Sequence, residues 1–590
     1  KVWARLTKEN VGRFIAVVMD DMVYSCPKVN GEITGGRSEI TGNFTPQEAK
    51  DLANVLKSGK MPAPSRIVQE DVVGPSLGQE AVEKGMISFI VAFILLMCYM
   101  IFMYGVVPGL IVDASLLFNV FFLVGILASF KSVLTLPGIA GIVLTLGMAV
   151  DANVLVYERV KEELLGGKSH KAAVTAGYKN ALSAIIDGNL TTLLTGIILF
   201  AFGTGPIRGF ATTLIIGIMT SLFSALVLTR LVYAWMEKGK VIDTLAFSTP
   251  LSKNLLKNVN INWVKIRKAG YVISSVFMLV AIGSLATRHL NLGIDFSGGR
   301  NYVVRFADNV STEDVLNRLQ NGFGDASVSV ITIGSENQVR ITTNYKVQDR
   351  SQSVDGEVET IIFESLKDYL PEGTTQEMFV RGYVINGGAP EMIVGGESET
   401  LGVQSSQKVG PAIANDILTS AMWSVLLAMV VIFLYIFIRF RNLGYSVGSL
   451  VALVHDVLFI LGLYSLFYSI MPFSMEIDQA FIAAILTIVG YSVNDTVVVF
   501  DRVREISGLY AKRPLSETVN EALNATLVRT LSTSVSTLLV LLSILILGGE
   551  TIRGFVFALT VGVVVGTYST LFVAVPIAYE IRNKQIAKGK

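Results

Sequence analysis

Two helix-length apolar stretches carry acidic and amide side chains, which are rare inside membranes. Residues 147–164 read GMAVDANVLVYERVKEEL, and residues 490–507 read GYSVNDTVVVFDRVREIS. Asp151 lies in the first stretch, and Asn494 and Asp495 lie in the second. An ionised carboxylate in hydrocarbon is costly unless it is neutralised or paired, and a carboxylic acid there is suited to bind and release a proton. These residues therefore favour ion transfer over a structural contact between helices, which is the alternative for buried polar groups.

The two stretches are copies of one repeat. Their starts lie 343 residues apart (490 minus 147), and five residues recur in register: Val150, Val154, Val156, Arg159 and Val160 match Val493, Val497, Val499, Arg502 and Val503. Further matches extend the repeat over both halves of the chain: 73–75 with 409–411, Asp113 with Asp456, 191–194 with 536–539, and 207–210 with 552–555. Two halves of equal orientation are a known transporter plan. We expect two pseudo-symmetric helix blocks related by an axis along the membrane normal.

Arg529 is a candidate partner for the buried carboxylates. It lies near the start of an apolar span, and Ala184 stands at the matching place in the first half. A permanently charged guanidinium inside a membrane needs a carboxylate partner. The alternative is that the long side chain reaches the cytoplasmic surface from its position near the end of the span. Because this arginine has no copy in the first half, we favour its pairing with Asp495.

Other polar residues in these spans are candidates for a supporting role. Asp187, with Thr191 at helical spacing, either joins a relay with Asp151 and Asp495 or lies near the membrane surface. The amides of Asn153, Asn189 and Asn494 fit a relay or a structural contact. For the matched pair Asp113 and Asp456 we expect solvated or helix-capping roles. Four charged residues end the two marked stretches: Glu158, Arg159, Asp501 and Arg502. We expect them to anchor the helices at the interface, and coupling to a partner's cytoplasmic loops is the alternative.

The composition identifies an integral membrane protein. Of 590 residues, 52% are hydrophobic and 16% are charged, whereas charged residues make up about 25% of soluble domains. Only Cys26 and Cys98 are cysteines, and the three histidines are scattered, so a disulfide framework and a metal site are both disfavoured. No Walker motif or nucleophile elbow is present, and the glycine pair in residues 293–299 predicts a tight turn rather than a phosphate loop. The sequence thus predicts no enzyme and no cofactor, and energy from an ion gradient or a partner.

The hydropathy pattern predicts a polytopic α-helical membrane protein. Each apolar run has the roughly 20 residues that cross a hydrocarbon layer. The eleven predicted spans are 86–107, 109–130, 136–157, 180–203, 207–236, 268–287, 417–438, 443–469, 478–500, 522–547 and 554–580. Residue 1 is not a methionine and falls in a soluble-looking segment. We therefore expect a preceding first helix in the natural protein, which gives twelve spans.

Two soluble segments interrupt the spans. Residues 1–84 read as the C-terminal part of a first α+β domain, with a buried strand at 14–19 and a helix at 46–57 capped by Thr45. Residues 288–416 predict a second, ferredoxin-like domain. Its predicted elements are a strand at 302–306, a helix at 312–322, strands at 327–333 and 338–343, and a helix at 357–369.

Positive charge predicts the orientation, because short loops rich in Lys and Arg stay in the cytoplasm. The linker 237–267 and the tail 582–590 are basic, so both soluble domains are expected to be extracytoplasmic. The remaining predicted parts are a five-span block at 85–236, a single span at 268–287 and a second five-span block at 417–581.

Several motifs resemble a known family. GGRSEITG (35–42), VGPSLG (73–78) and VDANVLVYER (150–159) resemble bacterial SecD. GIDFSGG (293–299), VGPA (409–412), VNDTVVVFDR (493–502) and RTLSTS (529–534) resemble SecF. The chain is identified as a member of the fused SecD–SecF family of bacterial Sec protein-export subunits, related to resistance-nodulation-division transporters.

The resemblance implies a protein of the bacterial cytoplasmic (inner) membrane that uses the proton-motive force to promote late stages of preprotein export. It implies that Asp151, Asp495 and Arg529 form the proton-conducting site. The implied partners are the Sec translocon channel, its accessory subunits, unfolded preprotein on the outer side and the lipid bilayer, with no nucleic acid. The coupling ion is expected to be H+, with Na+ left open because aspartates serve either.

Two other functions compete with this interpretation. An ion-coupled efflux pump for small molecules or lipids, from the same superfamily, needs large paired outer domains, and residues 288–416 are few for that. A passive scaffold of the export channel binds partners but conducts no ions, and proton flux in liposomes separates it from the first interpretation. Our hypothesis is that protonation of Asp151 and Asp495, biased by Arg529, switches the packing of the two blocks and moves the outer domains.

Overall fold

The computed structural model divides the chain into two units, residues 1–68 and 69–590. The structure describes all residues except 1, 20–21, 43, 45, 59–68, 133, 239–240, 255–258, 350–352, 393–399 and 589–590.

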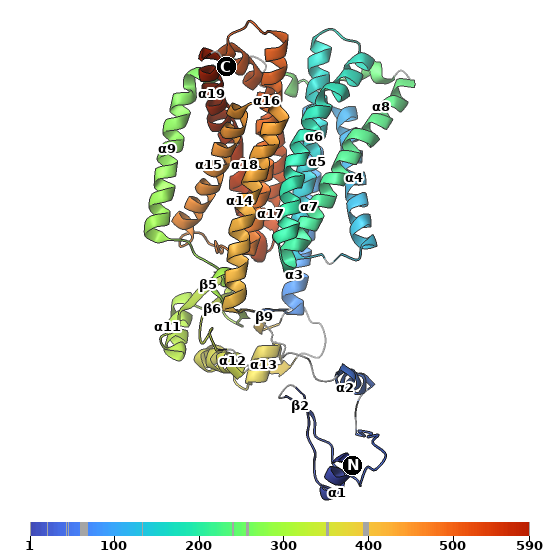
Figure 1. Cartoon of the computed structure of the whole chain (residues 1–590), viewed down its shortest axis with the longest axis vertical. Coiled ribbons are helices and arrows are strands. Elements are labelled where there is room, and N and C mark those ends of the chain that lie inside the picture. The colour runs from blue at the N-terminus through green and yellow to red at the C-terminus, as the bar shows by residue number, and fades with distance from the viewer. Residues whose placement is uncertain are drawn as a thin grey trace. The chain divides into compact units, whose positions relative to one another are not determined.

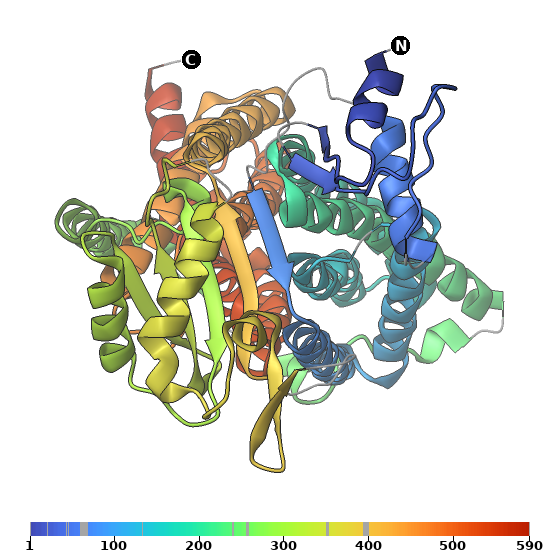
Figure 2. The same ribbon diagram turned by 90° about the horizontal axis from the view of Figure 1, so that it is seen from below.

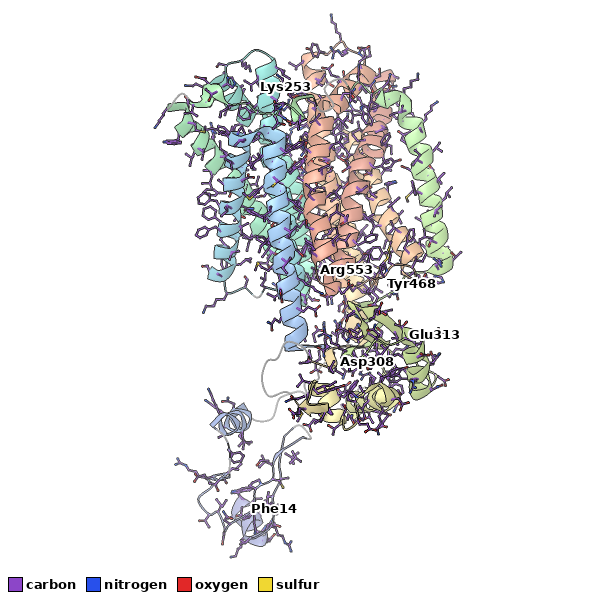
Figure 3. The ribbon with its side chains drawn as sticks, turned by 180° about the vertical axis from the view of Figure 1, so that it is seen from behind. Phe14, Lys253, Asp308, Glu313, Tyr468 and Arg553 are labelled. Atoms are coloured by element: carbon purple, nitrogen blue, oxygen red, sulfur yellow. The ribbon has the colours of Figure 1, made fainter. Side chains whose placement is uncertain are left out.

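The first unit contains a short hairpin and two helices: α1 (Val2–Glu9), β1 (Val17–Met19), β2 (Met22–Ser25) and α2 (Pro46–Ser58). Helix α2 confirms the predicted helix, while its predicted cap Thr45 lies outside the described residues. The prediction of a buried strand at 14–19 is wrong. Only its second half is a strand, Val18 is 52% exposed, and Phe14 (labelled in Figure 3) is 68% exposed. The hairpin pairs only with itself among the described residues of this unit, and a two-stranded hairpin by itself is at best marginally stable.

The second unit contains eleven described helices that are long and apolar enough to cross a membrane, which confirms the predicted number. The first block comprises α3 (Pro75–Tyr104), α4 (Val106–Ser129), α5 (Leu136–Leu165), α6 (His170–Phe202), and α7 (Gly205–Phe223), which continues through η1 (Ser224–Leu228) into α8 (Thr229–Lys238). The second block comprises α9 (Trp263–Arg288), α14 (Pro411–Phe440), α15 (Leu443–Phe467), α16 (Gln479–Leu509), α17 (Leu515–Leu547), and α18 (Glu550–Ser569), which continues through η5 (Thr570–Ala574) into α19 (Val575–Ala587).

Helices α5 and α16, which carry the two marked stretches, form the centre of the bundle. In each, 89% of the most apolar segment is buried inside the protein, against 22% in α9. Helix α5 packs against α6, α7 and α17, and α16 packs against α6, α17 and α18. Figure 1 shows the helices of the two blocks side by side, with the soluble sheet at one end. The apolar groups of α9 remain exposed, as expected for a helix that faces lipid.

Matching glycines bring the blocks close together. A Cβ on Gly147 would lie 3.2 Å from Thr537 Cα, and a Cβ on Gly490 would lie 3.0 Å from Thr192 Cα. These are the same contact in two copies, because both glycines and both threonines match in the repeat. Small residues allow such close helix packing where the hydrophobic effect between helices is weak. The α5–α17 and α6–α16 contacts therefore tie each block to the other.

A five-stranded antiparallel sheet forms the soluble part of the second unit. Its order is β3 (Gln69–Val73), β9 (Gly402–Val409), β4 (Gly299–Arg305), β6 (Ser335–Thr343) and β5 (Val328–Ile333). Alternate β4 residues such as Tyr302 and Val304 point into a core with α11 (Thr312–Phe323) and α12 (Ser353–Leu366). The order β9-β4-β6-β5 with two helices on one face confirms the predicted ferredoxin-like arrangement. The short α13 (Gln376–Arg381) and the hairpin of β7 (Tyr383–Asn386) and β8 (Ala389–Met392) precede β9.

The edge strand β3 differs from the expected domain organisation. Sequence analysis assigns residues 1–84 to the first soluble domain, but β3 pairs with β9 in the sheet of the second, as Figure 2 shows for the blue and orange strands. The two strands are repeat copies, and each runs through a Val-Gly-Pro sequence directly into a membrane helix, α3 or α14. A Cβ on Gly74 would lie 2.7 Å from Gln404 O, so glycine permits this close pairing. Both repeats thus contribute to one sheet.

Candidate functional site

Three buried charged side chains meet at the centre of the helix bundle. Asp151 comes from α5, Asp495 from α16 and Arg529 from α17, and their exposed fractions are 4%, 4% and 3%. Arg529 Nη2 donates to Asp151 Oδ1 at 2.6 Å, and Nη1 donates to Asp495 Oδ1 at 2.8 Å. The predicted pairing of Arg529 with Asp495 is confirmed, and the alternative of an arginine at the membrane surface is wrong. Arg529 also pairs with Asp151, which the prediction of an Arg529–Asp495 pair did not include.

Asn494 completes the cluster. Its Nδ2 donates to Asp151 Oδ2 at 2.6 Å, so both oxygens of that carboxylate accept a hydrogen bond. A Cβ on Gly188 would lie 1.7 Å from Asn494 Oδ1, which shows how tightly α6 holds this amide in place. The amide therefore orients Asp151 towards Arg529.

The charge balance of the cluster is uneven. Two carboxylates face one guanidinium, so the cluster carries a net charge of −1 when both are ionised and is neutral when one holds a proton. An uncompensated charge away from water is costly, so the form of the cluster with one bound proton is favoured over the form with a net negative charge. Three polar atoms in and beside the cluster are buried without a hydrogen-bond partner in the part of the chain that the structure describes: Asn494 Oδ1, Arg529 Nε and Thr530 Oγ1. The arrangement is suited to bind and release one proton.

Hydroxyl groups extend from the cluster towards the sheet. Tyr491, one helical turn before Asp495, shares a hydrogen bond of 3.0 Å with Thr537 Oγ1. Thr191 and Thr192 donate across the block interface to Gly490 O at 3.4 and 3.3 Å. Thr191 thus lies at the interface between the blocks and beside α16, where its hydroxyl binds backbone oxygens.

Asp187 lies outside this cluster and has partners of its own. Its carboxylate accepts from Tyr435 Oη at 2.9 Å and from Arg439 Nε at 2.7 Å, both on α14. The structure therefore does not bring Asp187 together with Arg529. Among the described residues, two predicted candidates, Asn153 and Asn189, donate only to carbonyls one turn earlier on their own helices, Ala149 and Ile185.

The expectation that Asp113 and Asp456 are solvated or cap helices is wrong. They are 2% and 1% exposed and lie inside α4 and α15, which begin at Val106 and Leu443, so neither residue caps a helix. Asp456 accepts from Ser492 Oγ at 2.7 Å, from Ser569 Oγ at 2.8 Å and shares a 3.0 Å contact with His455 Nδ1. Both oxygens of Asp113 lack a partner among the residues described. Their recurrence in both repeats was the sequence signal for a buried role.

The charged residues at the ends of α5 and α16 opposite the sheet pair with one another. Arg159 and Arg502 each contact Glu162 and Glu505, which match in the repeat and which sequence analysis missed. The expectation of interfacial anchoring therefore understates their role, because they join the two blocks. Two other pairs are Lys161 with Glu158 at 2.8 Å and Arg504 with Asp501 at 2.6 Å.

Comparison with family profiles identifies three matches. The profile described as "Protein export membrane protein SecD/SecF, C-terminal" matches residues 54–239 and 394–584. The profile "SecDF, P1 head subdomain" matches residues 1–63, and "SecD/SecF GG Motif" matches residues 283–310. Together they match the first helix block, the second block apart from most of α9, and parts of both soluble segments.

Individual relatives match nearly the whole chain. The protein translocase subunit SecDF of Thermus thermophilus is 34% identical over 99% of this chain and 73% of its own length. The SecDF of Bacillus subtilis is 31% identical over 96% of this chain and 73% of its own length. SecD of Rhodothermus marinus is 52% identical over 40% of this chain and 38% of its own length.

Solved structures agree with the fold. A crystal structure of SecDF from Thermus thermophilus, described as a translocon-associated membrane protein, has a TM-score of 0.76 at 33% identity and covers 98% of this chain and 73% of that one. A SecDF structure in a super-membrane-facing form has a TM-score of 0.66 at 33% identity and covers 100% and 74%. The sheet and bundle described above thus recur in proteins of known structure.

Proposed function

Since the chain belongs to the SecD/SecF family, as a fused SecDF translocase subunit, we propose that it couples proton flow through Asp151, Arg529 and Asp495 to late stages of preprotein export. It is a multi-pass protein of the bacterial inner membrane that assists Sec-dependent protein export, and it is a translocon auxiliary rather than an enzyme. Family membership also removes the efflux pump as the leading alternative.

The observation that carries the proposal is one guanidinium between two buried carboxylates from different blocks. Arg529 of α17 binds Asp151 of α5 in one block and Asp495 of α16 in the other. A proton on either carboxylate neutralises it and weakens its hydrogen bond to the arginine, because charged acceptors bind more strongly. Arg529 then favours the other partner. Proton binding therefore changes the contact between α5 and the second block.

The shared sheet supports transmission of this change to the outer side. Strand β3 continues into α3 of the first block, and its partner β9 continues into α14 of the second. The two paired strands are therefore anchored in different blocks. Relative motion of the blocks would strain the β3–β9 pairing or move the whole sheet. We infer that this motion acts on an unfolded preprotein emerging from the translocon channel, and that accessory subunits of the translocon bind nearby.

The domain organisation that fits this mechanism follows the sequence pattern with one change. We infer an outer domain at 1–68, an outer strand at 69–73, a five-span SecD-like block to 236, a cytoplasmic linker at 237–267 and a first SecF-like span at 268–287. A second outer domain at 288–416, a five-span block at 417–581 and a cytoplasmic tail complete the chain. Figure 3 supports the assignment of the cytoplasmic and outer parts to opposite ends of the helix bundle. Lys253 of the linker lies at one end, and Asp308 and Glu313 of the sheet domain lie at the other.

The test is ion flux and export with variants of the cluster. The full chain is reconstituted in liposomes, and H+ and Na+ gradients are imposed separately on the wild type, Asp151→Asn and Asp495→Asn. We expect both variants to lose proton flux and gradient-dependent export in membrane vesicles. Asn153→Ala is the matched control on α5, because its amide donates to Ala149 O of the same helix. Unchanged flux in Asp495→Asn would refute the proposal, and flux driven only by Na+ would change the coupling ion.

A further inference from the structure

The end of α16 nearest the sheet opens into an acidic cavity. The cavity has a volume of about 370 Å³ and lies between the sheet and the adjoining helix ends. Its charged lining consists of four carboxylates and one guanidinium: Asp71, Asp295, Glu476, Asp478 and Arg340. The sequence predicts no role for these residues, and for 293–299 it predicts only a tight turn.

The Gly-Ile-Asp turn is fixed against the loop before α16. Gly293 N donates to Ile477 O at 2.9 Å, and Ile477 N donates to Asn291 O at 2.8 Å. A Cβ on Gly293 would lie 3.5 Å from Asp478 Cβ, so the two chain segments touch. The turn then forms the short α10 (Ile294–Ser297), which places Asp295 at the first residues of α16.

Gly299 explains why the turn ends in a glycine pair. Its φ is +142°, a conformation that disfavours residues with a side chain, and a Cβ there would lie 2.8 Å from Thr343 O. Glycine at this position therefore lets the chain pass from α10 into β4 close to the carbonyl of Thr343. The turn that the glycine pair permits thus helps to hold Asp295 in position.

Two carboxylates of the cavity, Asp478 and Asp295, accept hydrogen bonds from the N-terminus of α16. Asp478 Oδ1 accepts from Phe481 N at 2.8 Å, and Asp295 Oδ2 accepts from Gln479 N at 3.1 Å. Asp295 is 8% exposed, yet its other oxygen, Oδ1, has no hydrogen-bond partner within the described ranges. Buried polar atoms are nearly always hydrogen-bonded, so this oxygen needs an explanation. A proton on this carboxyl group, or between it and its neighbour, supplies the missing hydrogen.

Charge in the cavity also favours a bound proton. Asp295 and Asp478 face Glu476 and Asp71, while Arg340 already lies 3.4 Å from Glu476 and 3.3 Å from Ser474 Oγ. Burial and, after it, the charge of the neighbouring Asp295 raise the pKa of Asp478 to about 7, against the lowering effect of its hydrogen bond from Phe481 N. Burial likewise raises the pKa of Asp295, and the charges of Asp71 and Glu476 act in the same direction.

Helix residues from both blocks form an apolar part of the cavity wall. Ile207, Ile552 and Phe555 line the cavity, and the rings of Phe210 and Phe555 pack edge to face with centroids 5.3 Å apart. The two phenylalanines match in the repeat and come from different blocks. Asp495 follows Gln479 by 16 positions, about 24 Å along the helix. Motion of the blocks would separate these rings.

We propose that Asp295 and Asp478 hold a shared proton on the outer side and load the Asp495 cluster from there, with Phe210 and Phe555 as the barrier between the two sites. The ligand is a proton supplied by the outer solution. The loading role rests on the proposed function, whereas proton binding in the cavity does not.

The first experiment measures proton influx into liposomes with the sheet domain outside, at a fixed gradient and varied outer pH. Asp478→Asn keeps an N-cap side chain and removes the titrating group. Because a donor with a pKa of about 7 matters most where protons are scarce, we expect influx about fivefold slower at an outer pH of about 7.5 and recovery at about 5.5. Asp478→Glu should restore the wild-type profile.

Asp308→Asn is the matched control, because Asp308 is exposed on the same outer domain (Figure 3). Wild-type influx of Asp478→Asn at both pH values overturns the proposal. Equal slowing at both pH values also overturns it, since a general packing defect acts independently of outer pH.

The second experiment detects the proton directly and separates the two proposals. Infrared difference spectra of Asp495→Asn should contain a protonated carboxyl band that titrates near pH 7 and disappears when Asp478→Asn is added. Absence of the band overturns the outer site. Normal flux in Asp495→Asn with the band present would instead refute the proposed central cluster and leave the outer proton site standing.

Discussion

Arg159 of α5 and Arg502 of α16 lie at matching positions of the repeat, and each pairs with the glutamate on the other's helix. Arg159 Nη2 lies 2.8 Å from Glu505, and Arg502 Nη2 lies 3.0 Å from Glu162. The four side chains form a closed ring across the block interface, at the end of the bundle opposite the sheet. Separation of the blocks at this end must open the ring.

Neutralising the ring should loosen this end of the bundle. For Arg159→Gln combined with Arg502→Gln, we expect a broader and longer distance distribution between spin labels at the exposed residues Leu165 and Leu509. The effect on stability should be small, below about 1 kcal/mol in a double-mutant cycle with Glu505→Gln, because the glutamates are more than one third exposed. Arg318→Gln, which breaks a pair within the outer domain, should leave the distribution unchanged. An unaltered distribution in the double variant would contradict this role.

Removing the central guanidinium should have a much larger effect. Arg529→Gln leaves Asp151 and Asp495 without their shared cation, and breaking a buried pair costs about 3–5 kcal/mol. We expect loss of proton flux and gradient-dependent export, measured in liposomes and membrane vesicles. Arg529→Lys should not restore flux, because one ammonium group does not reproduce the two directed hydrogen bonds of the guanidinium. Full activity of the lysine variant would show that charge alone is sufficient.

Filling the space at Gly188 should displace Asn494. The added Cβ of Gly188→Ala would lie 1.7 Å from Asn494 Oδ1, so the amide must move away from Asp151. We expect a loss of about 1–3 kcal/mol from overpacking, together with reduced proton flux. Gly125→Ala on α4 is the control, since its Cβ would have open space around it and alanine favours helix. Equal unfolding temperatures for the two variants would argue against the tight contact.

The outer carboxylates predict how stability depends on pH. The pKa of Asp478 is about 7 in the folded protein against 3.8 as its ordinary value, so the folded state binds the proton more tightly. Its contribution is fully present below the ordinary value and is lost as pH rises through about 7. Thermal unfolding in detergent should therefore occur at a higher temperature at pH about 5.5 than at about 7.5. The difference should shrink in Asp478→Asn but not in Asp308→Asn, and an equal shift in both variants would contradict the assignment.

The sequence by itself determined the membrane spans, the repeat and the central charged residues. Apolar length fixes a span, and a charged group within it must find a partner, so Asp151, Asp495 and Arg529 were predictable from type and position. The predicted ferredoxin-like elements followed in the same way from local periodicity, which depends on neighbouring residues.

Only the tertiary structure decided which groups meet. Helical periodicity gives the face on which Asp187 lies, but Arg439 comes from a helix of the other block, and Glu162 meets Arg502 across the same interface. The burial of Asp456 also depends on other helices, because it accepts hydrogen bonds from Ser492 of α16 and Ser569 of α18. The β3–β9 pairing and the acidic cavity at Asp295 likewise join segments far apart in sequence. Such contacts depend on how whole helices and strands pack, which local patterns do not specify.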